Sequence, residues 1–95
     1  MLETPFRDRV VIPKAKALGW KVYFTYRSDN SPAGFPDLVL CRERVIYAEL
    51  KSDEGELSAK QHEWLAALSA AGQECHVWYP KDINEITAIL TRRQP

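Results

Sequence analysis

Two carboxylates and one ammonium could together form a hydrolytic site in this chain. Asp37 ends the turn Gly34-Phe35-Pro36-Asp37, and Glu49 and Lys51 end the second of the two apolar runs that follow. Carboxylate oxygens are the ligands that Mg²⁺ and Mn²⁺ prefer, and these ions leave room for a phosphate. A neighbouring ammonium can neutralise charge that develops on such a phosphate. A lone Asp or a lone Glu-x-Lys triplet would mean little, because such short patterns occur by chance and suit a turn or a solvated strand end.

The register of a predicted hairpin brings these side chains together. If Arg42-Glu43-Arg44 forms the connection, the numbers of paired residues sum to 86, so Asp37 stands opposite Glu49 at about 5 Å between Cβ atoms. A slip of one residue would mix polar and apolar side chains on both faces. In the favoured register one face is aliphatic, with Leu38, Leu40, Ile46, Ala48 and Leu50, and the other carries Asp37, Val39, Cys41, Val45, Tyr47, Glu49 and Lys51.

The elements around the hairpin follow from hydrophobic periodicity and turn residues. We expect a helix capped by Thr4, with Pro5 first, a kink at Pro13 and an end at Gly19. Residues 20–27 alternate as a half-buried strand, 28–34 form a polar loop, and Ser58 starts an amphipathic helix that stops at Gly72. Residues 75–79 form a fourth strand, and Asp82 caps a last helix. The prediction is an α/β chain in the order αβββαβα, that is, an αβββαβ unit followed by a last helix.

Length, charge and cysteine content restrict the class of protein. Ninety-five residues suffice for one domain, 1–95, so any active site must be built on the core elements. Thirteen basic and thirteen acidic residues balance, so a nucleic acid would have to meet a local basic surface. We expect free thiols at Cys41 and Cys75 and no membrane span. Because MLETPFRDR lacks the apolar core of a signal peptide, we also expect a cytoplasmic protein.

Several segments together resemble a known nuclease family. Pro36-Asp37 followed by Glu49-Leu50-Lys51 resembles the PD-(D/E)XK signature, and the predicted element order is that superfamily's restriction-endonuclease-like core, a mixed central sheet flanked by helices. The stretches GFPDLVL, AELKSDEGELSAKQHEWL and AAGQECHVWYP are similar to the VRR-NUC nucleases, especially their small stand-alone phage and bacterial members. The resemblance covers the chain from Glu3 to about Ile89.

The resemblance implies a set of site residues. Asp37, Glu49, the carbonyl of Leu50 and the helix acid Glu3 would bind one or two Mg²⁺ or Mn²⁺ ions, and Lys51 would assist catalysis. Asp8 is the alternative helix acid, and Glu3 has a second interpretation as a first-turn residue favoured by the helix dipole.

Gln61 also allows two interpretations. The family's matching glutamine lies at the active site, but Ser58-Ala-Lys-Gln61 is also a capping box that would serve helix stability alone.

Candidate DNA contacts are weaker. Arg27, Ser28 and Ser31 precede Asp37 and carry groups that commonly bind phosphate, or they form a solvated loop. Arg42 and Arg44 at the hairpin tip either contact DNA or only add surface charge.

The family resemblance implies a structure-selective DNA endonuclease of a bacterial or phage-infected cell, with no nucleotide cofactor. It implies a homodimer that cuts four-way (Holliday) junctions or other branched DNA and leaves a 5′-phosphate. Apolar aromatic surface from Trp20, Tyr23 and Trp78 could supply the dimer interface, or all three could belong to the core. A less selective nickase or nuclease, or an inactive nucleic-acid-binding module of the same fold, remains the alternative.

Overall fold

A four-stranded mixed sheet forms the centre of the protein. The computed structural model describes residues 1–25 and 31–93, in which the strands are β1 (Lys21–Phe24), β2 (Leu38–Cys41), β3 (Val45–Leu50) and β4 (Glu74–Trp78). Their order in the sheet is β1-β2-β3-β4, with β1, β2 and β3 antiparallel and β4 parallel to β3. The predicted α/β class with a mixed sheet is confirmed, and it is compatible with a restriction-endonuclease-like core.

The predicted hairpin register is confirmed. Leu38 pairs with Ala48, Val39 with Tyr47 and Leu40 with Ile46. The predicted aliphatic face is fully buried, whereas most of the other face is only partly buried. Burial of one face fixes the register because a slip would expose every apolar side chain of the strand.

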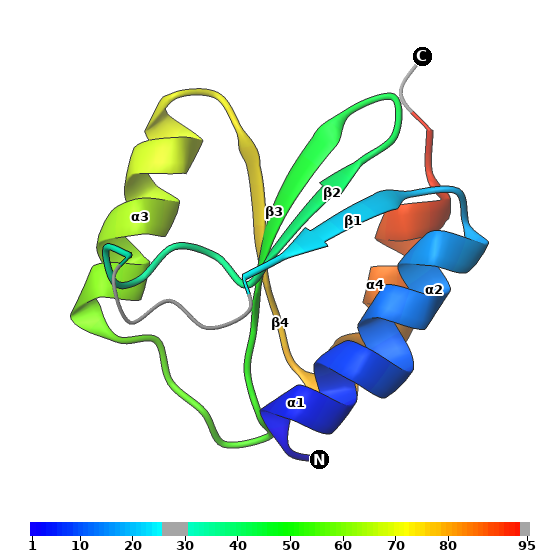
Figure 1. The fold of residues 1–95 in the computed structure, drawn as a ribbon, viewed down its shortest axis with the longest axis horizontal. Coiled ribbons are helices and arrows are strands. Elements are labelled where there is room, and N and C mark those ends of the chain that lie inside the picture. The colour runs from blue at the N-terminus through cyan, green and yellow to red at the C-terminus, as the bar shows by residue number, and fades with distance from the viewer. Residues whose placement is uncertain (26–30, 94–95) are drawn as a thin grey trace.

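Helices cover both faces of this sheet (Figure 1). The N-terminal helix, consisting of α1 (Glu3–Pro5), the π-helical η1 (Phe6–Val11) and α2 (Ile12–Ala17), lies on one side with α4 (Ile83–Thr91), and α3 (Ala59–Ala70) lies on the other. A short 3-10 helix, η2 (Pro80–Asp82), leads into α4. The sheet and the helices of the first side share one core cluster, which includes Phe6, Val11, Ala15, Ile86 and Leu90.

The N-terminal helix differs from its prediction at two points. It begins at Glu3 after Leu2, so Thr4 lies inside the first turn and does not cap it. A π-helical segment precedes Pro13, and there the Ile12 N–H donates to the carbonyl of Arg7, five residues back. Proline lacks an N–H and its ring crowds the carbonyl four residues before it in an α-helix, and a wider turn relieves that crowding. The predicted end is confirmed, since Gly19 has a φ of +93°.

The two later helices differ in how they begin. Ser58 caps α3 as predicted, with its side chain accepting from the Gln61 N–H. Asp82 precedes α4, but its carboxylate accepts from the Tyr79 N–H and so closes the 3-10 turn, because that turn brings the donor within 2.9 Å. Among the described residues, no helix is both long and apolar enough to cross a bilayer.

Candidate active site

Three carboxylates from separate parts of the chain meet at one point beside the sheet. Glu3 comes from α1, Asp37 directly precedes β2, and Glu49 lies in β3. One oxygen of each lies within 4.8 Å of the others. The strand register brings Asp37 to Glu49, and the N-terminal helix adds Glu3 from its first turn.

Backbone groups fix the position of Asp37. Its Oδ2 accepts from the Leu50 N–H at 2.8 Å, and its carbonyl accepts from the Thr25 N–H at 3.2 Å. The Lys51 N–H donates to the carbonyl of Trp78 in β4. Backbone groups of successive strand residues face opposite sides, so the N–H and carbonyl of Leu50 face the side of β2. The Leu50 carbonyl therefore points to the side of the strand on which Asp37 lies, as the expected metal ligand should.

Glu49 is the least solvated member of the cluster. Its side chain is fully buried, and neither carboxylate oxygen has a hydrogen-bond partner among the described residues. Burial and the adjacent Asp37 carboxylate raise the pKa of Glu49 to about 9. Burial, with Asp37 second, also raises the pKa of Glu3. An uncompensated buried carboxylate is costly, so this donor set fits a divalent cation bound by oxygen ligands.

Lys51 and Gln61 extend the site toward α3. Lys51 is only 9% exposed, and its Nζ donates to Gln61 Oε1 at 3.3 Å. The same oxygen accepts from the Ser58 N–H at 2.8 Å, and the Gln61 N–H donates to Ser58 Oγ at 3.2 Å. The two interpretations of Gln61 are therefore compatible, because one amide oxygen completes the capping box and also holds Lys51.

The structure separates the two candidate helix acids. Asp8 is exposed and accepts from Arg7 at 2.7 Å, a hydrogen bond that holds its pKa below the ordinary value. Only Glu3 of these two acids joins Asp37 and Glu49.

Arg7 is a charged residue near Glu3 and Asp37 that the sequence patterns did not identify as part of the site. Its guanidinium lies 5.2 Å from the centre of the Phe24 ring. The hydrogen bond to Asp8, followed by the charges of Asp37 and Glu3, raises its pKa. Its place four residues after Glu3, on the same helix face, is the signal that could have identified it.

The guanidinium groups of Arg42 and Arg44, which were predicted as candidate DNA contacts, are occupied by contacts within the protein. Both side chains are 9% exposed. Their guanidinium groups lie over the Trp20 ring, at 4.4 and 5.1 Å from its centre. They donate to backbone carbonyls that close the N-terminal helix and α4, namely those of Leu18, Leu90, Arg92 and Ile89. These contacts of the two arginines hold the hairpin to the helices. The observed geometry gives no support to a role of Arg42 or Arg44 in DNA binding.

The remaining residues predicted for DNA binding or for a dimer interface have different environments. Arg27 and Ser28 lie outside the described residues, and Ser31 is exposed. Trp20 and Trp78 are core residues, with exposed fractions of 3% and 2%, so neither can form a dimer interface. Tyr23, on the edge strand β1, is 64% exposed.

Comparison with known protein families gives a match that covers most of the chain. The family model of the VRR-NUC domain matches residues 10–81 of the 95-residue chain. This span includes Asp37, Glu49, Lys51 and Gln61, whereas Glu3 lies before it. No curated protein and no solved structure matches the chain.

Proposed function

The chain belongs to the VRR-NUC family of nucleases, and we propose that it is a divalent-metal-dependent endonuclease that hydrolyses phosphodiester bonds of DNA. The observation that carries the metal dependence is the meeting of Glu3, Asp37 and Glu49 within 4.8 Å, with Glu49 fully buried and unpartnered among the described residues. Three acids so close together are stable as anions only beside a cation.

Each residue has a distinct part in the proposed site. The three carboxylates, with the Leu50 carbonyl, would hold one or two Mg²⁺ or Mn²⁺ ions. Such an ion supplies an acidified water and polarises the phosphate. Lys51 places a positive charge beside the carboxylates, where it stabilises the negative charge that develops on the phosphate in the transition state. Gln61 holds that ammonium through its Oε1, which leaves its Nε2 as a donor for a phosphate oxygen.

We further propose a homodimer that acts on branched DNA, as the family resemblance implies. One small domain offers one such site, whereas paired nicks in a four-way junction need two sites related by symmetry. Nicking of unbranched DNA by a single protomer is the alternative.

The test is cleavage of a labelled four-way DNA junction and of linear duplex of the same sequence, in Mg²⁺ and in Mn²⁺. Wild type is compared with Lys51→Ala and with Lys16→Ala, a matched loss of an exposed lysine on α2. We expect paired nicks in the junction that disappear in Lys51→Ala and persist in Lys16→Ala.

Other outcomes assign the function differently. Equal cutting of junction and duplex would retain the nuclease and remove the preference for branched DNA. Binding of the junction without cutting in either metal would favour the inactive module.

A further inference from the structure

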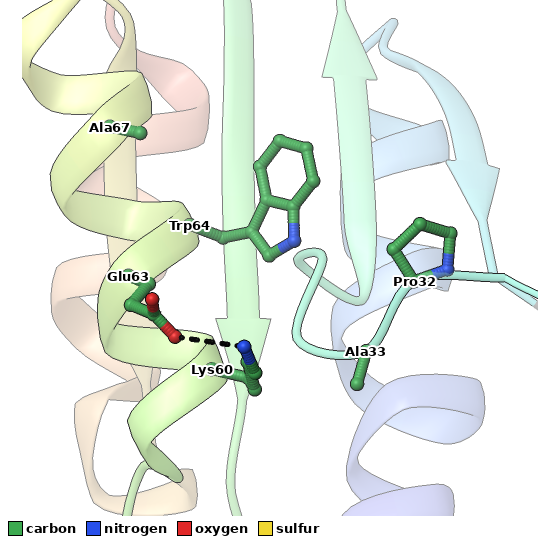
Figure 2. A pocket seen from close by; sticks show the side chains of 6 residues that line it. All are labelled: Pro32, Ala33, Lys60, Glu63, Trp64 and Ala67. Carbon is green, nitrogen blue, oxygen red and sulfur yellow. Dashed lines mark ion pairs between the residues drawn. The ribbon is translucent and has the colours of Figure 1, made fainter.

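Two adjoining hollows lie between α3 and the loop before β2, and both are lined by Pro32 and Trp64. The larger, about 600 Å³, is lined by Pro32, Ala33, Lys60, Glu63, Trp64 and Ala67. The smaller, about 350 Å³, is lined by aromatic rings from Tyr23, Phe35 and Trp64 and by the hydroxyl residues Thr25 and Ser31. In Figure 2 the indole of Trp64 extends from α3 toward the segment that carries Pro32 and Ala33.

Neighbouring groups hold the indole in place. The Phe35 ring packs against it at 5.1 Å between ring centres and an interplanar angle of 83°, and Phe35 in turn packs edge-on with Tyr47 at 6.1 Å. Gly34 has a φ of +96° and lies so close to α3 that a Cβ would be 2.5 Å from the backbone of Lys60. The loop and the helix are therefore packed together, and Trp64 is a fixed surface between the hollows.

The residues that line the smaller hollow are neighbours of the carboxylate site: Phe35 packs against Tyr47, which precedes Glu49 by two residues in β3. Thr25 donates its N–H to the carbonyl of Asp37, and Phe35 precedes Asp37 by two residues. Trp64 follows Gln61 by three residues on α3, so the two side chains lie on one face of the helix. A DNA strand held by its phosphate at Asp37 and Lys51 would carry its next nucleotide to this hollow.

The lining suits a nucleobase. Aromatic rings stack on any base because every base presents a π-face. The hydroxyls of Thr25 and Ser31 can donate to or accept from a base edge. Lys60 lines the larger hollow; its side chain is 68% exposed and its ion pair with Glu63 is 3.5 Å long, so it can turn to a phosphate at little cost.

We propose that the smaller hollow binds one unpaired nucleobase of the strand that is cut, stacked on Trp64. This inference rests on the proposed nuclease function and gives it a source of selectivity. A base inside a duplex is stacked and paired and cannot enter, whereas a base beside a branch point enters at a small cost.

The first experiment measures binding without turnover. A fluorescein-labelled oligothymidylate of about ten nucleotides is titrated in Ca²⁺ against wild type, Trp64→Leu and Trp64→Phe, with a fully paired hairpin as the second probe. Leucine keeps an apolar side chain against Phe35 but removes the stacking plane, and phenylalanine keeps a plane. We expect Trp64→Leu to weaken oligothymidylate binding about 5- to 150-fold and Trp64→Phe to keep most of it, with hairpin binding unchanged. Circular dichroism establishes that each variant is folded. If Trp64→Leu is not folded, the abasic substrate of the second experiment tests the base contact in wild type.

The second experiment uses cleavage. A duplex with one unpaired thymidine is compared with the same duplex carrying an abasic nucleotide at that position. In wild type the abasic change should reduce cleavage, and in Trp64→Leu it should have no further effect, because base and indole act through one contact.

Particular results would overturn the inference. Equal oligothymidylate affinity of wild type and Trp64→Leu refutes it even if the protein cleaves junctions, which leaves the proposed function intact. A change of oligomeric state in Trp64→Leu with unchanged DNA affinity would identify the hollow as a subunit contact instead. If wild type binds oligothymidylate through Trp64 but cleaves no DNA, the proposed function fails and the base site stands.

Discussion

Glu49→Gln should stabilise the metal-free protein at alkaline pH while it abolishes cleavage. Glu49 is fully buried, and burial and Asp37 raise its pKa from 4.5 to about 9. Between these values the folded chain keeps a proton that the unfolded chain releases. Stability therefore falls as pH rises through this range, by up to about 1.4 kcal/mol per pH unit.

The amide variant removes this dependence. Glutamine carries no charge and can donate to the Asp37 carboxylate, so its unfolding free energy should lack the contribution from residue 49. The difference between variant and wild type should grow to a few kcal/mol, in favour of the variant, from about pH 5.5 to about pH 8.5. Glu3 and Glu74 also titrate with shifted pKa values, but they are common to both proteins and cancel in the difference.

The assay is urea denaturation with EDTA across this pH range. Glu85→Gln, which changes an exposed glutamate on α4, is the matched control and should follow wild type. Parallel pH dependences of wild type and Glu49→Gln, or a less stable Glu49→Gln at about pH 8.5, would refute the burial argument. Added Mg²⁺ should flatten the wild-type dependence, because it compensates the carboxylate charge.

Three further predictions test separate contacts. Gly34→Ala should lower the free energy of unfolding more than Gly72→Ala does, because both glycines have positive φ but only a Cβ at Gly34 would clash with α3. We expect about 1 kcal/mol for the positive φ at each position and a further penalty at Gly34, measured by urea denaturation. Arg44→Ala should lower stability by about 2 kcal/mol or more and leave the DNA affinity of the folded protein unchanged, measured by thermal unfolding and fluorescence anisotropy. Ser58→Ala should cost about 1 kcal/mol as a lost helix cap, whereas Gln61→Ala should cost a similar amount and also reduce cleavage, because it releases Lys51.

Each of these expectations has a contrary result. Equal costs at the two glycines would mean that α3 moves to accept a Cβ. Weaker DNA binding by folded Arg44→Ala would restore the arginine as a DNA contact. Equal cleavage by Ser58→Ala and Gln61→Ala would limit the glutamine to capping.

The sequence predicted the parts of the site that depend on periodicity. Strand alternation alone placed Asp37 opposite Glu49, because only one register buries Leu38, Leu40 and the other aliphatic side chains together. The capping box at Ser58 was visible because its two bonds join residues three apart.

Other features required the tertiary structure. The contact between Gln61 and Lys51 joins two elements, and no pattern within either one specifies it. Arg42 and Arg44 read as solvent-exposed charges at a hairpin tip, but the fold brings Trp20 and the carbonyls of Leu18 and Leu90 to them. The hollow beside Trp64 likewise arises from a loop and a helix that are far apart in the sequence.

Calorimetric titration of Mn²⁺ into the metal-free protein is the most direct test of the proposed metal site. Wild type and Lys51→Ala should both bind the ion, and Asp37→Asn and Glu49→Gln should not, while junction cleavage should be found in wild type alone. Equal Mn²⁺ binding by wild type and Glu49→Gln would contradict the assignment of the buried carboxylate as a ligand. Absence of binding in folded wild type would contradict the metal site itself.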